Sequence, residues 1–503
     1  MGKININYQN GGIGGIIASN DGISGFVFDT ETIPSGFEVG ETKPIFGMDD
    51  VESLGITNNH LNEVKATGGG ITITAAAGAN EIIKVVIKAD NQNEVEIGRY
   101  VTVTGDDVND IAAGLANSIS LNPLWDATVS TNVISLVAPD GLGESINGAG
   151  VILVSSSNSE TDLTTTIGNF TGGEGSVMNI VHFILSSFFA ANPTSKIWVT
   201  FRDFTSAFDA NVISDIQTAS DGEIRQLGIW TQKNLSDSSA IITAANSVAE
   251  NQASKYKPLS VVLAFANAGS ATISNLDNLR TLSAKRVSVT ISNAWGNIEG
   301  GYILAGTTGL FPTDLGTVIG LISRSKVSNS IAWVEKNVTG VSNTMLITGE
   351  KWNQLENTTY PDELAQKGYL FQRKYFGYAG CYIDNDSVCD SLISDFDSIK
   401  RMRTIDKVAR IGYFSLVPYL SSPVVLDAEE GTLSLSTISK LESVLNSQIN
   451  AMFNASEISG FQVFINPTQN VLVNKNININ ITIVPIGSAD SITINLGYAL
   501  ALA

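Results

Sequence analysis

The sequence has 503 residues, of which 43% are hydrophobic and 16% are charged, so it can bury the cores of about three domains. Its 49 acidic residues outnumber its 29 basic residues, which gives a net charge of −20. Because phosphate binding requires Lys and Arg, this balance argues against direct nucleic-acid binding as the main function.

The cysteine content and the apolar segments indicate where the chain is made. Cys381 and Cys389 are too few for a disulfide framework, which is typical of a reducing cytoplasm. The first residues lack the apolar stretch of a secretory signal, so we expect no leader. The longest apolar stretch, 181–191, is too short to span a bilayer, so we expect no membrane insertion.

Residues 1–65 are predicted to form an N-terminal arm followed by the start of the core. Ile4, Ile6 and Tyr8 alternate with polar residues, which is the pattern of a strand with one buried face. Such a strand can close the protein's own sheet or add to a sheet of another subunit, and the alternation alone favours neither. Glycines that release the chain from regular structure follow at Gly11, Gly12, Gly14 and Gly15.

Residues 66–175 are predicted to form an inserted β-rich domain. Glycine-rich stretches at 67–70 and 171–175 are typical of linkers at its two ends. Between them lie several β-branched runs and one amphipathic helix that should end before Pro123. The apolar face of this helix carries Val108, Ile111, Leu115 and Ile119.

Residues 176–335 are predicted to form a doubly wound α/β domain. Continuous apolar runs are typical of strands buried on both faces of a parallel sheet. Helical segments with short connections separate the runs, as repeated β-α-β units require. One of these helices is expected around Leu276, Leu279 and Leu282. The strand runs lie at 197–201, 224–230, 259–265 and 286–292.

Residues 336–503 are predicted to form an α+β domain that ends in a strand arm. Apolar periodicity predicts helices at about 387–410 and 435–453. A second alternating run at 492–496 is expected to pair with the arm as a hairpin. As at the other end, the arm can belong to the protein's own sheet or to a neighbour's. Its apolar positions are Ile477, Ile479, Ile481 and Ile483.

The sequence contains no pattern that supports catalysis or metal binding. It has no GxSxG elbow, HExxH motif or phosphate-binding loop. Asp384, Asp386 and Asp395 match three positions of a calcium loop, but Val388 and Cys389 stand where a ligand and a glycine are needed. We therefore expect no catalytic residues, no metal and no cofactor.

One concentrated basic feature stands out in this acidic chain. It can be a solvated helix face with local pairs such as Asp397 with Arg401 and Asp406 with Arg410. It can also be a docking face for an acidic partner surface. The residues are Lys400, Arg401, Arg403, Lys407 and Arg410.

Four segments, in their order along the chain, resemble contractile tail sheath proteins of phages and related injection systems. The first, LGTVIGLISRSKVSNSIAWVEKNVTGV at 315–341, combines a small-residue helix, a turn with Arg324 and an aromatic segment with Trp333. The insertion at 66–175 resembles the variable outer domains of many sheaths. The other three segments lie at 364–386, 399–420 and 456–485.

The resemblance implies a structural subunit without enzymatic activity. Such subunits polymerise with themselves as helical stacks of hexameric rings around an inner tube, and contraction drives the tube through the target envelope. The resemblance places the chain in a virion tail that is assembled in the host cytoplasm. Its partners would be other copies of itself, the inner tube protein, and baseplate and tail terminator proteins.

The resemblance also assigns roles to residues. The alternating residues at both termini would be arms that add strands to neighbouring subunits, and Gly11 to Gly15 would be the arm hinge. The basic helix that contains Arg401 and Arg403 would face the tube. Two alternatives stay open: another tail, baseplate or surface-layer assembly protein, and an enzyme on the α/β domain.

Overall fold

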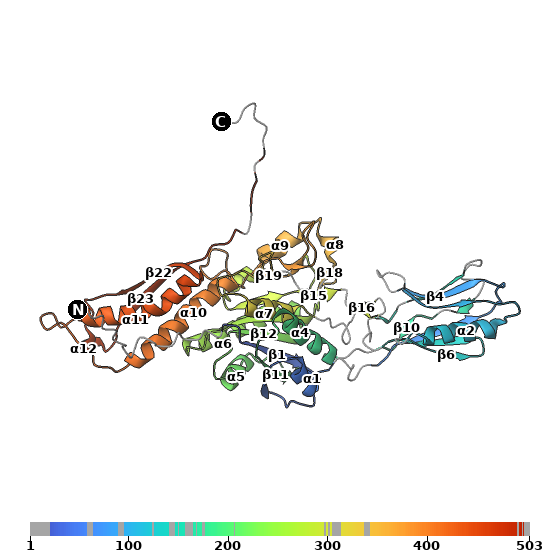
Figure 1. Cartoon of the computed structure of the whole chain (residues 1–503), viewed down its shortest axis with the longest axis horizontal. Coiled ribbons are helices and arrows are strands. Elements are labelled where there is room, and N and C mark those ends of the chain that lie inside the picture. The colour runs from blue at the N-terminus through green and yellow to red at the C-terminus, as the bar shows by residue number, and fades with distance from the viewer. Residues whose placement is uncertain are drawn as a thin grey trace, which may run out of the picture. The chain divides into compact units, whose positions relative to one another are not determined.

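The chain folds into two compact units (Figure 1). The α/β unit contains Gly22–Ser325 and Ile331–Ile399, and the terminal unit contains Met1–Asp21, Lys326–Ser330 and Lys400–Ala503. The computed structural model describes residues 21–57, 64–88, 95–122, 125–139, 146–148, 150–155, 164–166, 168–173, 177–205, 207–295, 298–299, 302–303, 313–336, 343–489, 492–494 and 496.

In the described part of the α/β unit, seven strands form a mostly parallel sheet in the order β19-β14-β13-β12-β1-β11-β2. The edge strand β2 runs antiparallel to β11. Four strands, β11 to β14, fall on the predicted apolar runs, whereas the central strand β1 was missed. The strands are β1 (Ser24–Thr30), β2 (Thr42–Ile45), β11 (Ile197–Asp203), β12 (Gln226–Asn234), β13 (Ser260–Asn267), β14 (Val287–Thr290) and β19 (Tyr369–Leu370).

Helices pack on both faces of this sheet because its strands are apolar on both sides. Phe26 and Phe28 of β1 share one core with α4 and α7, and Val27 between them shares the other core with α5 and α6. Alternate residues of one strand thus enter two separate cores. The helices are α4 (Val177–Ala191), α5 (Val212–Ala219), α6 (Ser238–Ser254) and α7 (Leu315–Arg324).

Short elements complete the α/β unit. The helix expected around Leu276 to Leu282 is reduced to one 3-10 turn, Leu279–Thr281, so that prediction was wrong in extent. The other elements are α1 (Met48–Ser53), β15 (Ser292–Trp295), β16 (Ile298–Glu299), β17 (Tyr302–Ile303), β18 (Asn343–Leu346), α8 (Trp352–Leu355), α9 (Tyr360–Lys367), β20 (Gln372–Arg373) and β21 (Tyr382–Ile383).

A buried carboxyl group lies at the start of α7. Asp314 accepts hydrogen bonds from the Thr290 hydroxyl at 2.5 Å and from the Gln372 amide at 3.3 Å. Its burial raises the pKa of the carboxyl to about 7, although both hydrogen bonds lower it. The proton is therefore retained in the folded chain at a pH where it is lost from the unfolded chain.

The Asp314→Asn variant should lose a pH dependence that the native chain has. Because the folded pKa is raised, the stabilisation by the protonated carboxyl is complete below pH 3.8 and is lost as the pH rises to about 7. Between these two pH values, the contribution of the carboxyl group to the free energy of unfolding falls by roughly 4 kcal/mol. Urea unfolding at pH 5 and pH 8 captures roughly 3 kcal/mol of this difference. An equal change in the free energy of unfolding between the two pH values in both proteins would contradict the assignment.

The segment 64–173 has a hydrophobic cluster of its own, whose buried members all lie between Ala66 and Phe170. Its helix α2 begins after Asp107, whose carboxylate accepts hydrogen bonds from the backbone N–H groups of Asn109 and Asp110. The predicted helix face is present, and the boundaries 66–175 stay a prediction. The elements are β3 (Thr67–Ile73), β4 (Ile82–Lys88), β5 (Val95–Val101), α2 (Val108–Ser120), β6 (Asp126–Ser130), β7 (Val133–Val137), β8 (Gly150–Ser155), β9 (Thr164–Thr166) and β10 (Phe170–Thr171).

Two long helices and a hairpin form the described part of the terminal unit (Figure 1). The helix predicted at 435–453 is confirmed as α11, and it buries five apolar residues at helical spacing, from Ile438 to Met452. The elements are α10 (Ile399–Leu416), a 3-10 turn (Val417–Tyr419), α11 (Leu435–Asn454), β22 (Ile458–Ile465), α12 (Val471–Asn474) and β23 (Ile479–Pro485).

The helix predicted at 387–410 begins only at Ile399, so the prediction was wrong over residues 387–398. The carbonyl groups of Val388, Asp390 and Asp397 accept hydrogen bonds from the Arg280 guanidinium, each at 3.3 Å. A loop that wraps a guanidinium in this way replaces helical hydrogen bonds. The apolar spacing that suggested a helix included Leu392, which is 60% exposed.

The predicted hairpin between 477–483 and 492–496 was also wrong. β23 pairs antiparallel with β22, an earlier strand of the same chain. Ile492, Ile494 and Leu496 are exposed and have no strand structure in the residues that are described. Apolar residues do alternate in the last run, but this pattern did not identify the strand that pairs with β23.

Candidate assembly site in the terminal unit

The β22–β23 hairpin has one face packed on the helices and one face open to solvent. Phe461 lies opposite Ile483, Val463 opposite Ile481, and Ile465 opposite Ile479. These cross-strand pairs contact the buried residues of α10 and α11. The predicted isoleucines thus lie in a strand with one buried face, and Ile477 packs against the same helices.

Both outer edges of this hairpin lack a further strand in the described residues. The Ile465 N–H donates to the Glu442 carboxylate of α11 at 3.1 Å, so it points away from β23. Because residues two apart in a strand project in the same direction, the N–H groups of Phe461 and Val463 also face this outer edge of β22.

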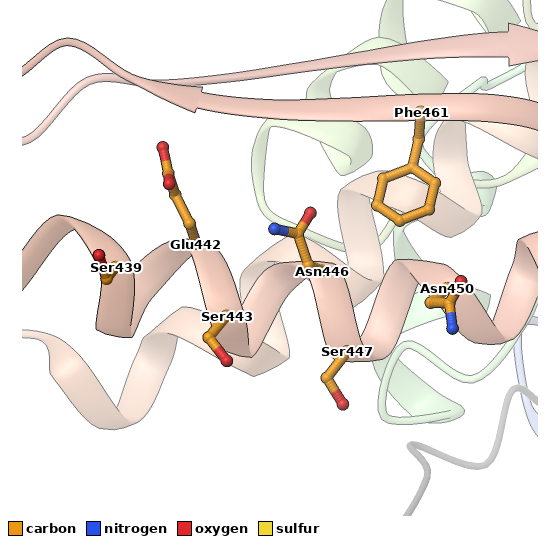
Figure 2. A pocket seen from close by; sticks show the side chains of 7 residues that line it. All are labelled: Ser439, Glu442, Ser443, Asn446, Ser447, Asn450 and Phe461. Carbon is orange, nitrogen blue, oxygen red and sulfur yellow. The ribbon is translucent and has the colours of Figure 1, made fainter.

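A polar groove runs beside that edge (Figure 2). Serine and asparagine side chains of α11 line it, and Phe461 of β22 closes one side (Figure 2). Its volume is about 570 Å³. Apart from Glu442, the lining is uncharged, and its serines and asparagines can hydrogen-bond to Asn and Ser side chains of an added segment. The α11 residues are Ser439, Glu442, Ser443, Asn446, Ser447 and Asn450.

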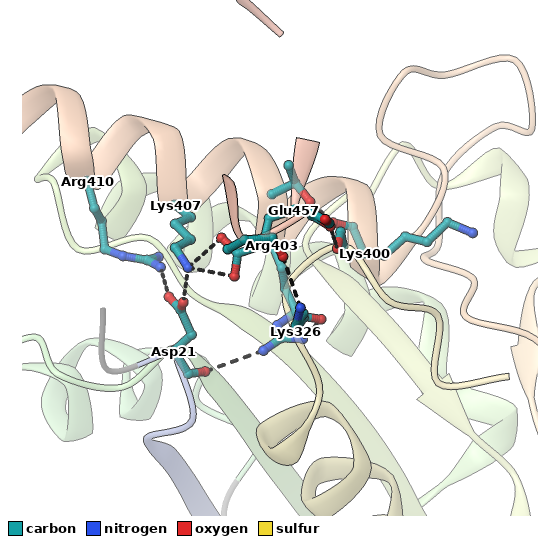
Figure 3. A network of polar contacts seen from close by, with 11 residues as sticks. Asp21, Lys326, Lys400, Arg403, Lys407, Arg410 and Glu457 are labelled. Atoms are coloured by element: carbon teal, nitrogen blue, oxygen red, sulfur yellow. Dashed lines mark hydrogen bonds and ion pairs between the residues drawn. The ribbon is translucent and has the colours of Figure 1, made fainter. Parts of the chain in front are cut away.

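A buried ion cluster lies at the start of the hairpin (Figure 3). The Lys407 ammonium is 2.7 Å from the Asp21 carboxylate and 2.7 Å from the Glu457 carboxylate. The Arg410 guanidinium is 2.6 Å from Asp21. The Arg403 guanidinium donates to the Asp21 and Lys326 carbonyl oxygens at 3.4 Å. Basic side chains of α10 thereby connect the residue before β22 to the last residue of the N-terminal segment.

This arrangement gives four of the five predicted basic residues partners within the terminal unit, and a docking role for this helix stays a prediction. Lys400, Arg403 and Lys407 are each less than 10% exposed, and each contacts a residue of the same unit. Burial lowers the pKa of Arg403 to about 10, against the opposing effect of Asp21. A 3-4-3 spacing at 400, 403, 407 and 410 places four bases on one helix face, which could have indicated a shared internal partner.

No sequence pattern pointed to Asp21 or Glu457. The predicted arm residues Ile4, Ile6 and Tyr8 lie outside the described residues, as do Gly11, Gly12, Gly14 and Gly15. The role of Arg401 as a tube-facing residue stays a prediction.

The remaining candidate features are the two cysteines, a metal site and a membrane-spanning helix. Cys381 and Cys389 are buried free thiols, and burial raises the pKa of Cys381 to about 11. In the described ranges, no three His, Cys, Asp or Glu side chains lie close enough together to hold a metal ion. None of the described helices is both long enough and apolar enough to cross a membrane.

Residues 1–387 match the N-terminal domain of DUF2586 and residues 395–503 match its C-terminal domain, so the chain belongs to the DUF2586 family. No curated protein matches the chain.

Some solved structures of contractile injection assemblies contain similar chains. A chain of the anti-feeding prophage baseplate, 6-fold symmetrised, is 14% identical with a TM-score of 0.45, and the match covers 63% of this chain and 80% of that one. A chain of the PVC sheath complex in the contracted state, from an extracellular contractile injection system, is 11% identical with a TM-score of 0.44, covering 65% and 86%.

Proposed function

We propose that this chain is the structural subunit of a contractile tail sheath, which polymerises with itself through strand addition at the β22–β23 hairpin. The observation that carries the proposal is a two-stranded sheet with a packed inner face and no further strand at either edge in the described residues. The sequence supports it with the ordered sheath-like segments and with the alternating Ile4, Ile6 and Tyr8.

The edges of this hairpin lack the features that keep soluble proteins from pairing edge to edge. Exposed edge strands usually carry Lys, Pro or inward-pointing charges. β22 has the sequence ISGFQVFI and β23 has INITIVP, so neither has a charged residue, and the only proline is the last residue of β23. Phe464 and Val484 on the outer face are about half exposed. Strands from other subunits would satisfy both the backbone groups and these apolar side chains.

The groove beside β22 fits an added strand of the kind found in the terminal segments. In an added strand with Asn-Ile alternation, one residue type would lie on the same face as Phe461, toward α11, and the other on the solvent face of the sheet. In the proposed assembly, stacked hexameric rings surround an inner tube, and tube, baseplate and terminator proteins are the partners. Contraction would repack the subunits while the added strands keep neighbours connected. The chain would work without catalysis.

Sedimentation velocity of the purified chain over a range of protein concentrations tests self-association. We expect a cooperative change from the 53.2 kDa chain to very large particles. A baseplate subunit would instead stop at a single closed ring, and a species of 53.2 kDa at every concentration and salt would contradict the proposal.

A further inference from the structure

Both terminal segments contact the same helix, α10, at defined side chains. At the N-terminal side, the Asp21 carboxylate lies 2.7 Å from Lys407 and 2.6 Å from Arg410 (Figure 3). At the C-terminal side, the Lys400 ammonium donates to the Ser488 hydroxyl at 2.6 Å, three residues after the end of β23. In the part of the chain that the structure describes, Asp21 and Ser488 are thus points at which each segment contacts α10.

The contacts at Asp21 are of the kind that is costly to break. Lys407 is 9% exposed and Arg403 is 4% exposed, so water cannot replace a lost partner. Lys407 contacts the carboxylates of both Asp21 and Glu457, Arg410 contacts that of Asp21, and Arg403 donates to the Asp21 carbonyl oxygen. Removing one partner of a buried ion pair leaves the other charge unpaired, which is far more destabilising than losing a surface pair. These contacts therefore hold Asp21 firmly against α10.

We propose that the basic face of α10 is an anchor that sets where both terminal segments leave the terminal unit, with Asp21 and Ser488 as the anchored residues. Its importance for assembly rests on the proposed sheath function, but the anchoring is a property of the single chain. It gives the basic residues an internal positioning role in place of tube docking. Because Asp21 and Ser488 are held in place, each segment leaves the subunit at a fixed position. This reduces the conformational entropy that is lost when the segment adds a strand to a neighbouring subunit.

Nitroxide spin labels near each anchor test this in the unassembled full-length chain. Labels are placed on Ser19→Cys and, separately, on Ala489→Cys, since the native Cys381 and Cys389 are buried. Asp21→Asn should shorten the rotational correlation time of the label at 19 severalfold and leave the label at 489 unchanged. Lys400→Met should do the reverse. The matched control Asp49→Asn changes an exposed carboxylate of α1 and should alter neither label.

A second variant covers the case in which Asp21→Asn unfolds the terminal unit. Arg410→Met removes one contact to Asp21 and leaves the Lys407–Glu457 pair intact, so it should also mobilise the label at 19. Unchanged label mobility in both Asp21→Asn and Arg410→Met would overturn the anchor. If the labels respond as expected but the native chain never polymerises, the anchor stands and the proposed sheath function fails.

Discussion

Replacing Gly316 by alanine is expected to destabilise the α/β unit by at least about 3 kcal/mol. A Cβ atom at this position would lie 1.7 Å from the Ile184 carbonyl oxygen of α4. Backbone atoms cannot move aside as a flexible side chain can, so α4 and α7 must separate and disturb the core that contains Phe188. The gain in helix propensity from Gly to Ala, about 1 kcal/mol, is too small to offset this.

Gly412→Ala is the matched control, because Gly412 also lies inside a helix. Its added methyl would be 3.8 Å from the nearest side-chain atom of Ile481, an ordinary contact. We expect this variant to be neutral or more stable by up to about 1 kcal/mol. Thermal unfolding followed by calorimetry compares the two variants. Equal unfolding temperatures for Gly316→Ala and the native chain would show that α4 and α7 do not pack this closely.

Deleting the terminal segments beyond the anchors is expected to abolish self-association without unfolding the chain. The two deletions are residues 2–18, which retains Asp21, and residues 490–503, which retains Ser488 and all of β23. Among the described residues, neither deletion removes a member of the hydrophobic clusters around α10 and α11. Sedimentation velocity should show a folded monomer for each deletion, with an unchanged unfolding temperature.

A longer deletion, of residues 476–503, is the informative contrast. It removes β23, including Ile479, Ile481 and Ile483, which pack against the buried residues of α10 and α11. Each of these partly buried side chains contributes roughly 1–2 kcal/mol, so the terminal unit should unfold. If the short deletions still polymerise like the native chain, the terminal segments are not the assembly strands.

The sequence predicted best those elements whose pattern repeats locally. The runs that became β11 to β14 are apolar without interruption, and the inward residues of α11 follow a regular helical spacing. The small-residue helix near Gly316 was identified by resemblance, and the close contact with α4 now gives it a physical reason.

The structural features that the sequence did not predict share a different cause, because each depends on a partner distant in sequence. The 387–398 segment is a loop since Arg280 binds its carbonyl groups, and no local pattern encodes that contact. β23 pairs with β22 and not with the run at 492–496, although apolar and polar residues alternate in both β23 and that run. The internal partners of the bases of α10, Asp21 nearly 400 residues away and Glu457, are likewise not encoded by any local pattern.

Negative-stain microscopy of the purified, concentrated chain tests the sheath proposal most directly. The account predicts hollow cylinders in side view and rings with the symmetry of a hexamer in end view, both absent after deletion of residues 490–503. Isolated compact particles at every salt and protein concentration, with no rings or cylinders, would contradict it.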